Sequence, residues 1–216
     1  HELFGDNGFK NIIAKISELE KELDIYELSK ANPSTRQNKK KIEQFTDQVV
    51  VKEFLDAVEN KTMEEIYWVG GEPLMWDIHW TTMKRIIELG YANQVYPRYN
   101  TNLSKIDFQG DNLFQILKHF KDWMICASID ATGDIGEYIR TGLNYNEWLE
   151  NFKQGLTIQT NPRQMRLDVT ITLPSLFDVQ NLINLSSELN VMMLTKICYA
   201  FDLNLKSVSI PHFNLD

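Results

Sequence analysis

Two short runs in the second half of the chain decide the fold: residues 123–129 read WMICASI, and residues 167–173 read LDVTITL. Both are apolar or β-branched on both faces, as expected of strands that are covered on both sides. A stretch with helical periodicity, residues 145–158, separates them. A strand, a helix and a second strand in this order form a βαβ unit, so the sequence predicts an α/β fold with a parallel sheet.

The same alternation continues in both directions from this unit. We expect further strands over residues 66–69, 95–99 and 195–201, with helices near residues 79–89, 112–120 and 178–189. Ahead of them, residues 9–30 have apolar side chains at helical spacing, and Asp47 can serve as the N-cap of a second helix. The sequence therefore predicts an N-terminal helical segment over residues 1–60, with a polar mobile loop near 31–46, and an α/β core over residues 61–216.

Composition limits the classes of protein to which the chain can belong. The 216 residues carry a formal net charge of −8, and no apolar run reaches the roughly 20 residues that span a membrane. There is no signal-peptide pattern, so we expect a cytoplasmic protein that does not enter a membrane. An acidic surface repels phosphate groups, which argues against general nucleic-acid binding.

The two cysteines, Cys126 and Cys198, are far apart and belong to no CxxC pair. Each lies in an apolar, strand-like run, so we expect both to be buried and to act as small apolar residues. Any metal site would then need ligands from outside this segment. Two histidines, His79 and His119, fall in helical stretches, and we expect both at the surface.

Polar residues follow several of the predicted strands, at the edge where parallel α/β sheets bind their ligands. The first strand ends in Gly70, Gly71, Glu72 and Pro73. Two glycines let the backbone approach a ligand closely, and the Glu72 carboxylate can accept from a cationic amine. The same four residues could instead form an ordinary βα turn with a solvated glutamate, since short glycine motifs are common.

The next two strands also end in polar side chains. Asn100 and Asn102 could hydrogen-bond a polar ligand, or they could simply form a turn. Ser128 and Asp130 alternate along the third strand and so point to one face, where a hydroxyl and a carboxylate suit a ribose or an amino acid. They could equally cap the turn that follows.

Two further positions complete the set of candidate residues. Arg140 lies in the loop or helix entry after the third strand and could pair with a carboxylate in a bidentate way, or face solvent. Thr172 ends the fourth strand, where its hydroxyl could contact a ligand, although threonine is also a good strand former.

Three segments together resemble the radical S-adenosylmethionine (radical-SAM) enzymes, in particular the branch with SPASM or twitch extensions. They are IYWVGGEPLM (66–75), YNTNLS (99–104) and ASIDATGDIGEYIRTG (127–142). The resemblance covers residues 66–175 and implies a partial parallel (β/α)6 TIM-like barrel of the radical-SAM type.

The resemblance also implies a role for each matching residue. In the family, the turn that matches Gly70–Pro73 holds the amino group of S-adenosylmethionine, and the strand end that matches Ser128 and Asp130 approaches its ribose and carboxylate. An arginine in the position of Arg140 often pairs with the methionine carboxylate, and Asn102 matches an asparagine of the active-site floor. Ala131 stands where the family usually has glycine. The predicted cofactor-binding residues are Gly70, Gly71, Glu72, Pro73, Asn100, Asn102, Ser128, Asp130, Arg140 and Thr172.

The family's CxxxCxxC loop, which binds a [4Fe-4S] cluster, precedes the GGEP motif, and no cysteine precedes Glu72 here. We expect that this chain is a segment of a radical-SAM enzyme that starts after that loop. The implied enzyme binds S-adenosylmethionine and, with an external electron donor, generates a 5′-deoxyadenosyl radical that abstracts hydrogen from a substrate, by analogy a peptide.

Two alternatives stay open. The chain could be a cluster-free S-adenosylmethionine-binding or scaffold protein that retains the fold without radical chemistry. An unrelated TIM-barrel hydrolase or isomerase is the third possibility, but no cluster of His, Asp and Glu at the strand ends supports it. No catalytic or metal-binding residue is predicted within the 216 residues.

Overall fold

The structure, a computed structural model, describes residues 49–198. The chain divides into two units between Leu55 and Asp56, and the second unit contains the sheet. Four predicted features lie wholly or partly outside the described residues: the helix over 9–30, the polar loop near 31–46, the N-cap at Asp47 and the end of the last strand. No helix of the described part is long and apolar enough to cross a membrane.

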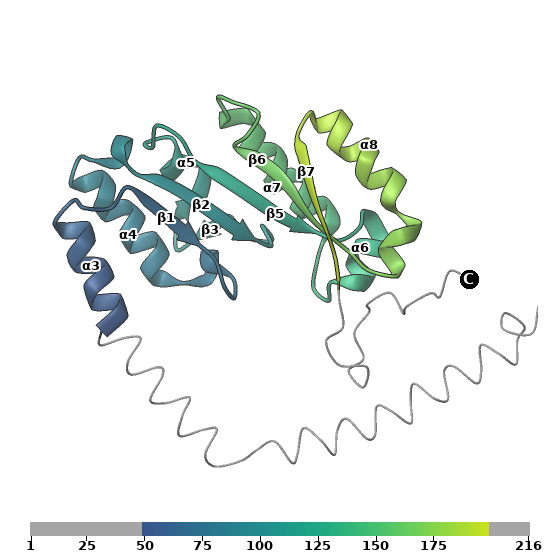
Figure 1. Ribbon diagram of the computed structural model, residues 1–216, viewed down its shortest axis with the longest axis horizontal. Coiled ribbons are helices and arrows are strands. Elements are labelled where there is room, and N and C mark those ends of the chain that lie inside the picture. The colour runs from purple at the N-terminus through teal and green to yellow at the C-terminus, as the bar shows by residue number, and fades with distance from the viewer. Residues whose placement is uncertain (1–48, 199–216) are drawn as a thin grey trace, which may run out of the picture. The chain divides into compact units, whose positions relative to one another are not determined.

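A five-stranded parallel sheet forms the centre of the described chain (Figure 1). Its strands are β1 (Glu65–Trp68), β2 (Tyr96–Thr101), β5 (Met124–Ile129), β6 (Met165–Ile171) and β7 (Met192–Ile197). They lie side by side in the order β1-β2-β5-β6-β7, which follows the chain without a reversal. The prediction of an α/β fold with a parallel sheet and alternating helices is therefore confirmed.

Helices connect successive strands, as the periodicity predicts. They are α4 (Asp77–Glu88), α5 (Leu113–Leu117), α6 (Gly133–Ile139), α7 (Tyr145–Ile158) and α8 (Val179–Leu189), and α3 (Val51–Glu59) precedes the sheet. Short 3-10 helices are η3 (Pro73–Met75), η4 (Ala92–Gln94) and η5 (Pro174–Phe177), and β3 (Asp107–Phe108) pairs with β4 (Asp111–Asn112) in a small ribbon. Two predictions differ from the structure: α5 is shorter than residues 112–120, and the last strand begins at Met192 rather than at residue 195.

One face of the sheet is packed against the helices. His79 of α4 shares a hydrogen bond of 2.9 Å with Tyr99 of β2, and a Cβ on Gly155 of α7 would lie 2.6 Å from the Met165 sulfur of β6. Right-handed crossovers between strands in sequential order place every connecting helix on the same side. The buried side chains of this face are Ile66, Trp68, Tyr99, Ile125, Ala127, Ile129, Leu167 and Val169.

The opposite face, called the open face below, carries mostly polar side chains. Paired residues of parallel strands point to the same side, so the register assigns to it Glu65, Tyr67, Arg98, Asn100, Cys126, Ser128, Arg166, Asp168, Thr170 and Lys196. The prediction that the runs 123–129 and 167–173 are covered on both sides holds in part: Met124, Cys126 and Asp168 are buried on this face, whereas Ser128 and Thr170, toward the carboxyl ends of β5 and β6, are half-exposed.

Candidate functional site

The glycine turn after β1 leaves its backbone open to approach. Gly70 has a φ of +94°, a conformation that favours glycine. Both Gly70 and Gly71 are exposed, and a Cβ on either would meet no atom within 4 Å. Pro73 is buried and begins η3, which fixes the exit from the turn. A ligand could therefore reach the main chain between β1 and η3.

Glu72 joins this turn to the end of the neighbouring strand β2. Its Oε1 accepts hydrogen bonds from the Thr101 hydroxyl at 2.5 Å and from the Leu74 amide at 3.3 Å, and its Oε2 accepts from the Asn102 amide at 2.8 Å. Asn102 itself turns the chain, since its Oδ1 accepts from the amide and hydroxyl of Ser104. The structure thus brings Glu72 and Asn102 together, with the Glu72 carboxylate engaged in bonds within the protein.

Asp130 and Arg140 form a bidentate ion pair after β5. The Arg140 Nε donates to Oδ2 of Asp130 at 2.7 Å and Nη2 donates to Oδ1 at 3.1 Å. Helix α6 lies close to this turn, because a Cβ on Gly136 would be only 2.2 Å from the Ala131 carbonyl oxygen. Two of the five Arg140 N–H donors are used by Asp130, which leaves others for a ligand carboxylate.

Asp178, which the sequence did not single out, ties the β5 turn to the start of α8. It is buried, and its carboxylate accepts from the Thr132 amide at 2.5 Å, the Thr132 hydroxyl at 3.1 Å and the Asn181 side chain at 2.6 Å. Thr172, by contrast, is used within its own turn: its amide donates to the Ser175 hydroxyl at 2.6 Å. The structure does not bring Thr172 into contact with the other predicted site residues.

A second polar group lies on the open face, in the carboxyl half of the sheet. Oδ2 of Asp168 accepts from Lys196 Nζ at 2.8 Å and from Asn100 Nδ2 at 3.5 Å. Asn100 and Asp168 belong to strands on either side of β5, whose small Cys126 and Ser128 side chains let them meet. Asp168 and Lys196 are absent from the sequence-based set. The only sequence signal for these two residues was a charged side chain inside a strand-like run: Asp168 in residues 167–173 and Lys196 in residues 195–201.

His79 is the clearest error of the sequence interpretation. It is fully buried rather than at the surface, and burial lowers its pKa from 6.5 to about 3. The ring lies edge-on to Trp68 and Trp80, with centroids 4.9 and 4.8 Å away. The Trp80 indole also donates a hydrogen bond to the Leu74 carbonyl at 2.9 Å. This bond connects the aromatic cluster to η3, which directly follows the glycine turn.

The remaining cysteine and histidine predictions have mixed outcomes. His119 is exposed, as predicted. Cys126 is buried, as predicted, and burial raises the pKa of its thiol. Cys198 is half-buried, so the prediction of full burial is wrong for it. Among residues 49–198, no three His, Cys, Asp or Glu side chains are grouped so that they could hold a metal ion.

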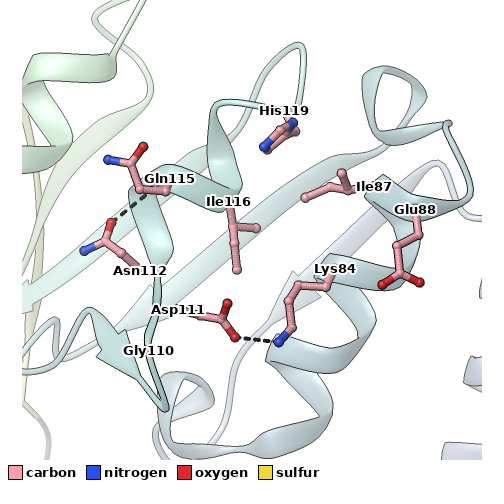
Figure 2. Close-up of a pocket in the computed structure, with 9 residues that line it drawn as sticks. All are labelled: Lys84, Ile87, Glu88, Gly110, Asp111, Asn112, Gln115, Ile116 and His119. Atoms are coloured by element: carbon pink, nitrogen blue, oxygen red, sulfur yellow. Dashed lines mark hydrogen bonds and ion pairs between the residues drawn. The ribbon is translucent and has the colours of Figure 1, made fainter.

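Of two surface pockets, one lies away from these groups and one lies beside them, between α6 and η5. Figure 2 shows one of about 390 Å³ between α4 and α5, where Lys84 pairs with Asp111 at 2.6 Å and His119 lies on the rim. None of the predicted site residues lines it. The other, of about 490 Å³, is apolar and is lined by Tyr138, Leu173 and Phe177 beyond the ends of β5 and β6. Tyr138 and Phe177 are 79% and 83% exposed.

Comparison with known proteins gives no assignment. No protein-family model matches the chain, and no curated protein sequence matches it.

Proposed function

We propose that this chain is part of a radical-SAM enzyme and that it binds S-adenosylmethionine at the carboxyl ends of its strands. The observation that carries the proposal is the open glycine turn at Gly70 and Gly71. The engaged Glu72 carboxylate follows β1 and bonds to the end of β2, and the Asp130–Arg140 pair follows β5, the next strand along the same edge. That combination is the one expected where a parallel sheet holds a small charged ligand.

A partial (β/α)6 TIM-like barrel is the form of α/β fold that we propose. In doubly wound sheets the strand order reverses at a switch point, and helices cover both faces. Here the order is sequential, and α4 and α7 pack on one face. Both features favour a segment of a barrel, in which the open face would line the interior.

The residues present are compatible with the cofactor. The exposed backbone at Gly70 and Gly71 can approach its amino group, and Glu72 accepts three hydrogen bonds, which leaves capacity for a fourth. The free N–H donors of Arg140 can pair with its carboxylate. Ser128, half-exposed on the open face, offers a hydroxyl to the ribose.

The chemistry itself belongs to the cofactors. An electron from a reduced [4Fe-4S] cluster would cleave the sulfonium C–S bond, yielding methionine and a 5′-deoxyadenosyl radical that takes hydrogen from the substrate. The two cysteines of these 216 residues form no CxxxCxxC motif. In this proposal the cluster ligands therefore come from polypeptide outside them, an external donor supplies the electron, and a peptide is the substrate that analogy suggests.

Calorimetric titration of the chain with S-adenosylmethionine tests the binding step. Gly71→Val is the sharpest variant, because Gly71 lacks a positive φ and its Cβ would meet open space, so the fold should tolerate valine while the ligand is blocked. Arg140→Lys keeps the charge but loses bidentate geometry, and Arg163→Ala, at the opposite edge of the sheet, is its control. Wild-type affinity in both Gly71→Val and Arg140→Lys would place the cofactor elsewhere.

The radical step is tested on the full-length gene product. After anaerobic reconstitution with iron and sulfide and reduction with dithionite, 5′-deoxyadenosine should accumulate and be measurable by chromatography. Tight S-adenosylmethionine binding without iron uptake or 5′-deoxyadenosine would instead establish the cluster-free alternative.

A further inference from the structure

The acidic side chains at the sheet differ in how fully the protein uses them. Glu72, Asp130 and Asp178 each accept hydrogen bonds on both carboxylate oxygens. Asp168 accepts on Oδ2 only, and no described residue donates to its Oδ1. On the open face, Oε2 of Glu65 also lacks a described donor, but Glu65 is 49% exposed, so Asp168 is the mostly buried carboxylate with an oxygen left for a donor that the described chain does not supply.

Most of the Asp168 side chain is buried, but its Oδ1 remains accessible from the open face. The Asp168 side chain is 10% exposed, whereas its partner Lys196 is 55% exposed, and the Asn100 bond is at the long limit of 3.5 Å. A solvent-exposed ammonium stabilises a carboxylate only weakly. Asp168 therefore adds little to the stability of the fold, and its Oδ1 can accept from a ligand on the open face.

Three other side chains around Asp168 also have unused hydrogen-bonding capacity. The Ser128 hydroxyl, in register with Asp168, forms no hydrogen bond with a described residue. Asn100 donates from Nδ2 and leaves its Oδ1 to accept. Lys196 uses one of its three N–H donors. Three acceptors and one cation thus converge from four strands: β2, β5, β6 and β7.

We propose that Asn100, Ser128, Asp168 and Lys196 bind a free α-amino acid group, with its ammonium toward Asp168 and its carboxylate toward Lys196. The ammonium has three N–H donors, which match the acceptors on Asp168, Asn100 and Ser128. Asp168 and Lys196 carry opposite charges, so a ligand with a single charge can form an ion pair with only one of them. A zwitterion pairs both charges.

This inference deepens the proposed function, because it names the class of group that the open face receives. That group belongs to an amino acid substrate, because Gly70, Gly71, Glu72 and Arg140 take the methionine end of S-adenosylmethionine in the proposed function. The binding measurement does not require S-adenosylmethionine, so failure of the cofactor proposal would leave the amino acid result interpretable.

The test is titration of the 216-residue chain, followed by nuclear magnetic resonance, with each of the common L-amino acids. N-acetyl-L-alanine, which lacks the ammonium, and L-alaninamide, which lacks the carboxylate, are the control ligands. At least one free amino acid should bind, and the resonances that shift should include those of residues 100, 128, 168 and 196. Neither blocked analogue should bind.

Asp168→Asn and Lys196→Gln should each weaken binding by about tenfold or more, as expected for the loss of a hydrogen bond between charged groups. Asp111→Asn is the matched control, since Asp111 forms a comparable ion pair with Lys84 in the pocket of Figure 2. Thermal unfolding verifies that each variant folds. Simultaneous binding of the amino acid and S-adenosylmethionine is expected for a substrate site. Displacement of the amino acid by S-adenosylmethionine would place the methionine end of the cofactor here instead of at Arg140 and would contradict both proposals. The proposal is overturned if no free amino acid binds, or if Asp168→Asn and Lys196→Gln bind as tightly as Asp111→Asn.

Discussion

His79 gives the described fold a specific dependence on pH. The folded state holds this imidazole neutral, with a pKa of about 3 against an ordinary value of 6.5, because it is buried among aromatic rings. Between these two values the unfolded chain binds a proton that the folded chain does not. Stability is therefore fully present above pH 6.5 and falls as the pH drops toward 3.

The size of this effect follows from the shift. Each pH unit below 6.5 costs 2.303RT, or about 1.4 kcal/mol, while the folded imidazole stays neutral. Between pH 7 and pH 5 the His79 imidazole of the unfolded state goes from about one-quarter to almost fully protonated. The free energy of unfolding should therefore fall by about 2 kcal/mol from this residue alone.

Urea unfolding at pH 7 and pH 5 measures the effect in three proteins: wild type, His79→Gln and His119→Gln. Glutamine can keep a hydrogen bond to Tyr99 but does not titrate, so His79→Gln should lose about 2 kcal/mol less than wild type between the two pH values. Exposed His119 is the control and should leave the wild-type difference unchanged. Carboxylates that titrate in this range contribute equally to all three proteins and cancel. An equal loss in wild type and His79→Gln would refute a buried, neutral His79.

Three further predictions concern the loops at the strand ends and the thiols. Gly136→Ala places a methyl group against the Ala131 carbonyl and should cost about 1–3 kcal/mol in thermal unfolding; an unchanged midpoint would mean that α6 is not packed so closely. Asp178→Ala leaves buried donors after β5 without an acceptor and should cost about 1–3 kcal/mol in urea unfolding, a result that a freely solvated loop would not give. Cys126, whose pKa is raised by burial, should react with a disulfide reagent much more slowly than half-buried Cys198 in the native protein; equal rates would contradict the burial of β5.

The order of strands and helices was predictable because it depends on local periodicity. The stretches 145–158 and 178–189 match α7 and α8 closely, since each has a clear apolar stripe. The start of β7 was missed because most of this edge strand is exposed, so burial imposes no strong pattern on it. Helix α5 is short because Asn112 caps it immediately before Leu113, and the chain turns again after Leu117.

The sequence predicted only those candidate-site residues that directly follow a predicted strand, such as Glu72, Asn102 and Asp130. The Asp168–Lys196 and Thr132–Asp178 contacts depend on register between strands and on how loops meet, and no local pattern encodes either. His79 was a different kind of failure, because the information was present. It precedes buried Met83 by four residues and Ile86 by seven, which places it on the apolar stripe of α4.

Asp130 and Asp178 accept hydrogen bonds on both carboxylate oxygens, whereas Asp168 accepts on one. This difference bears on whether the chain is a scaffold or a ligand-binding protein. A protein that keeps only the fold needs links such as Asp130–Arg140 and Asp178–Thr132, which stabilise loops. It has no need of a mostly buried carboxylate with one oxygen left unpaired. If Asp168 is held for a ligand, Asp168→Asn should lower the free energy of unfolding by no more than about 1 kcal/mol, because an ion pair to the half-exposed Lys196 contributes little, while it weakens amino acid binding. A loss as large as that of Asp178→Ala would show that Asp168 serves the fold, and the scaffold interpretation would then gain.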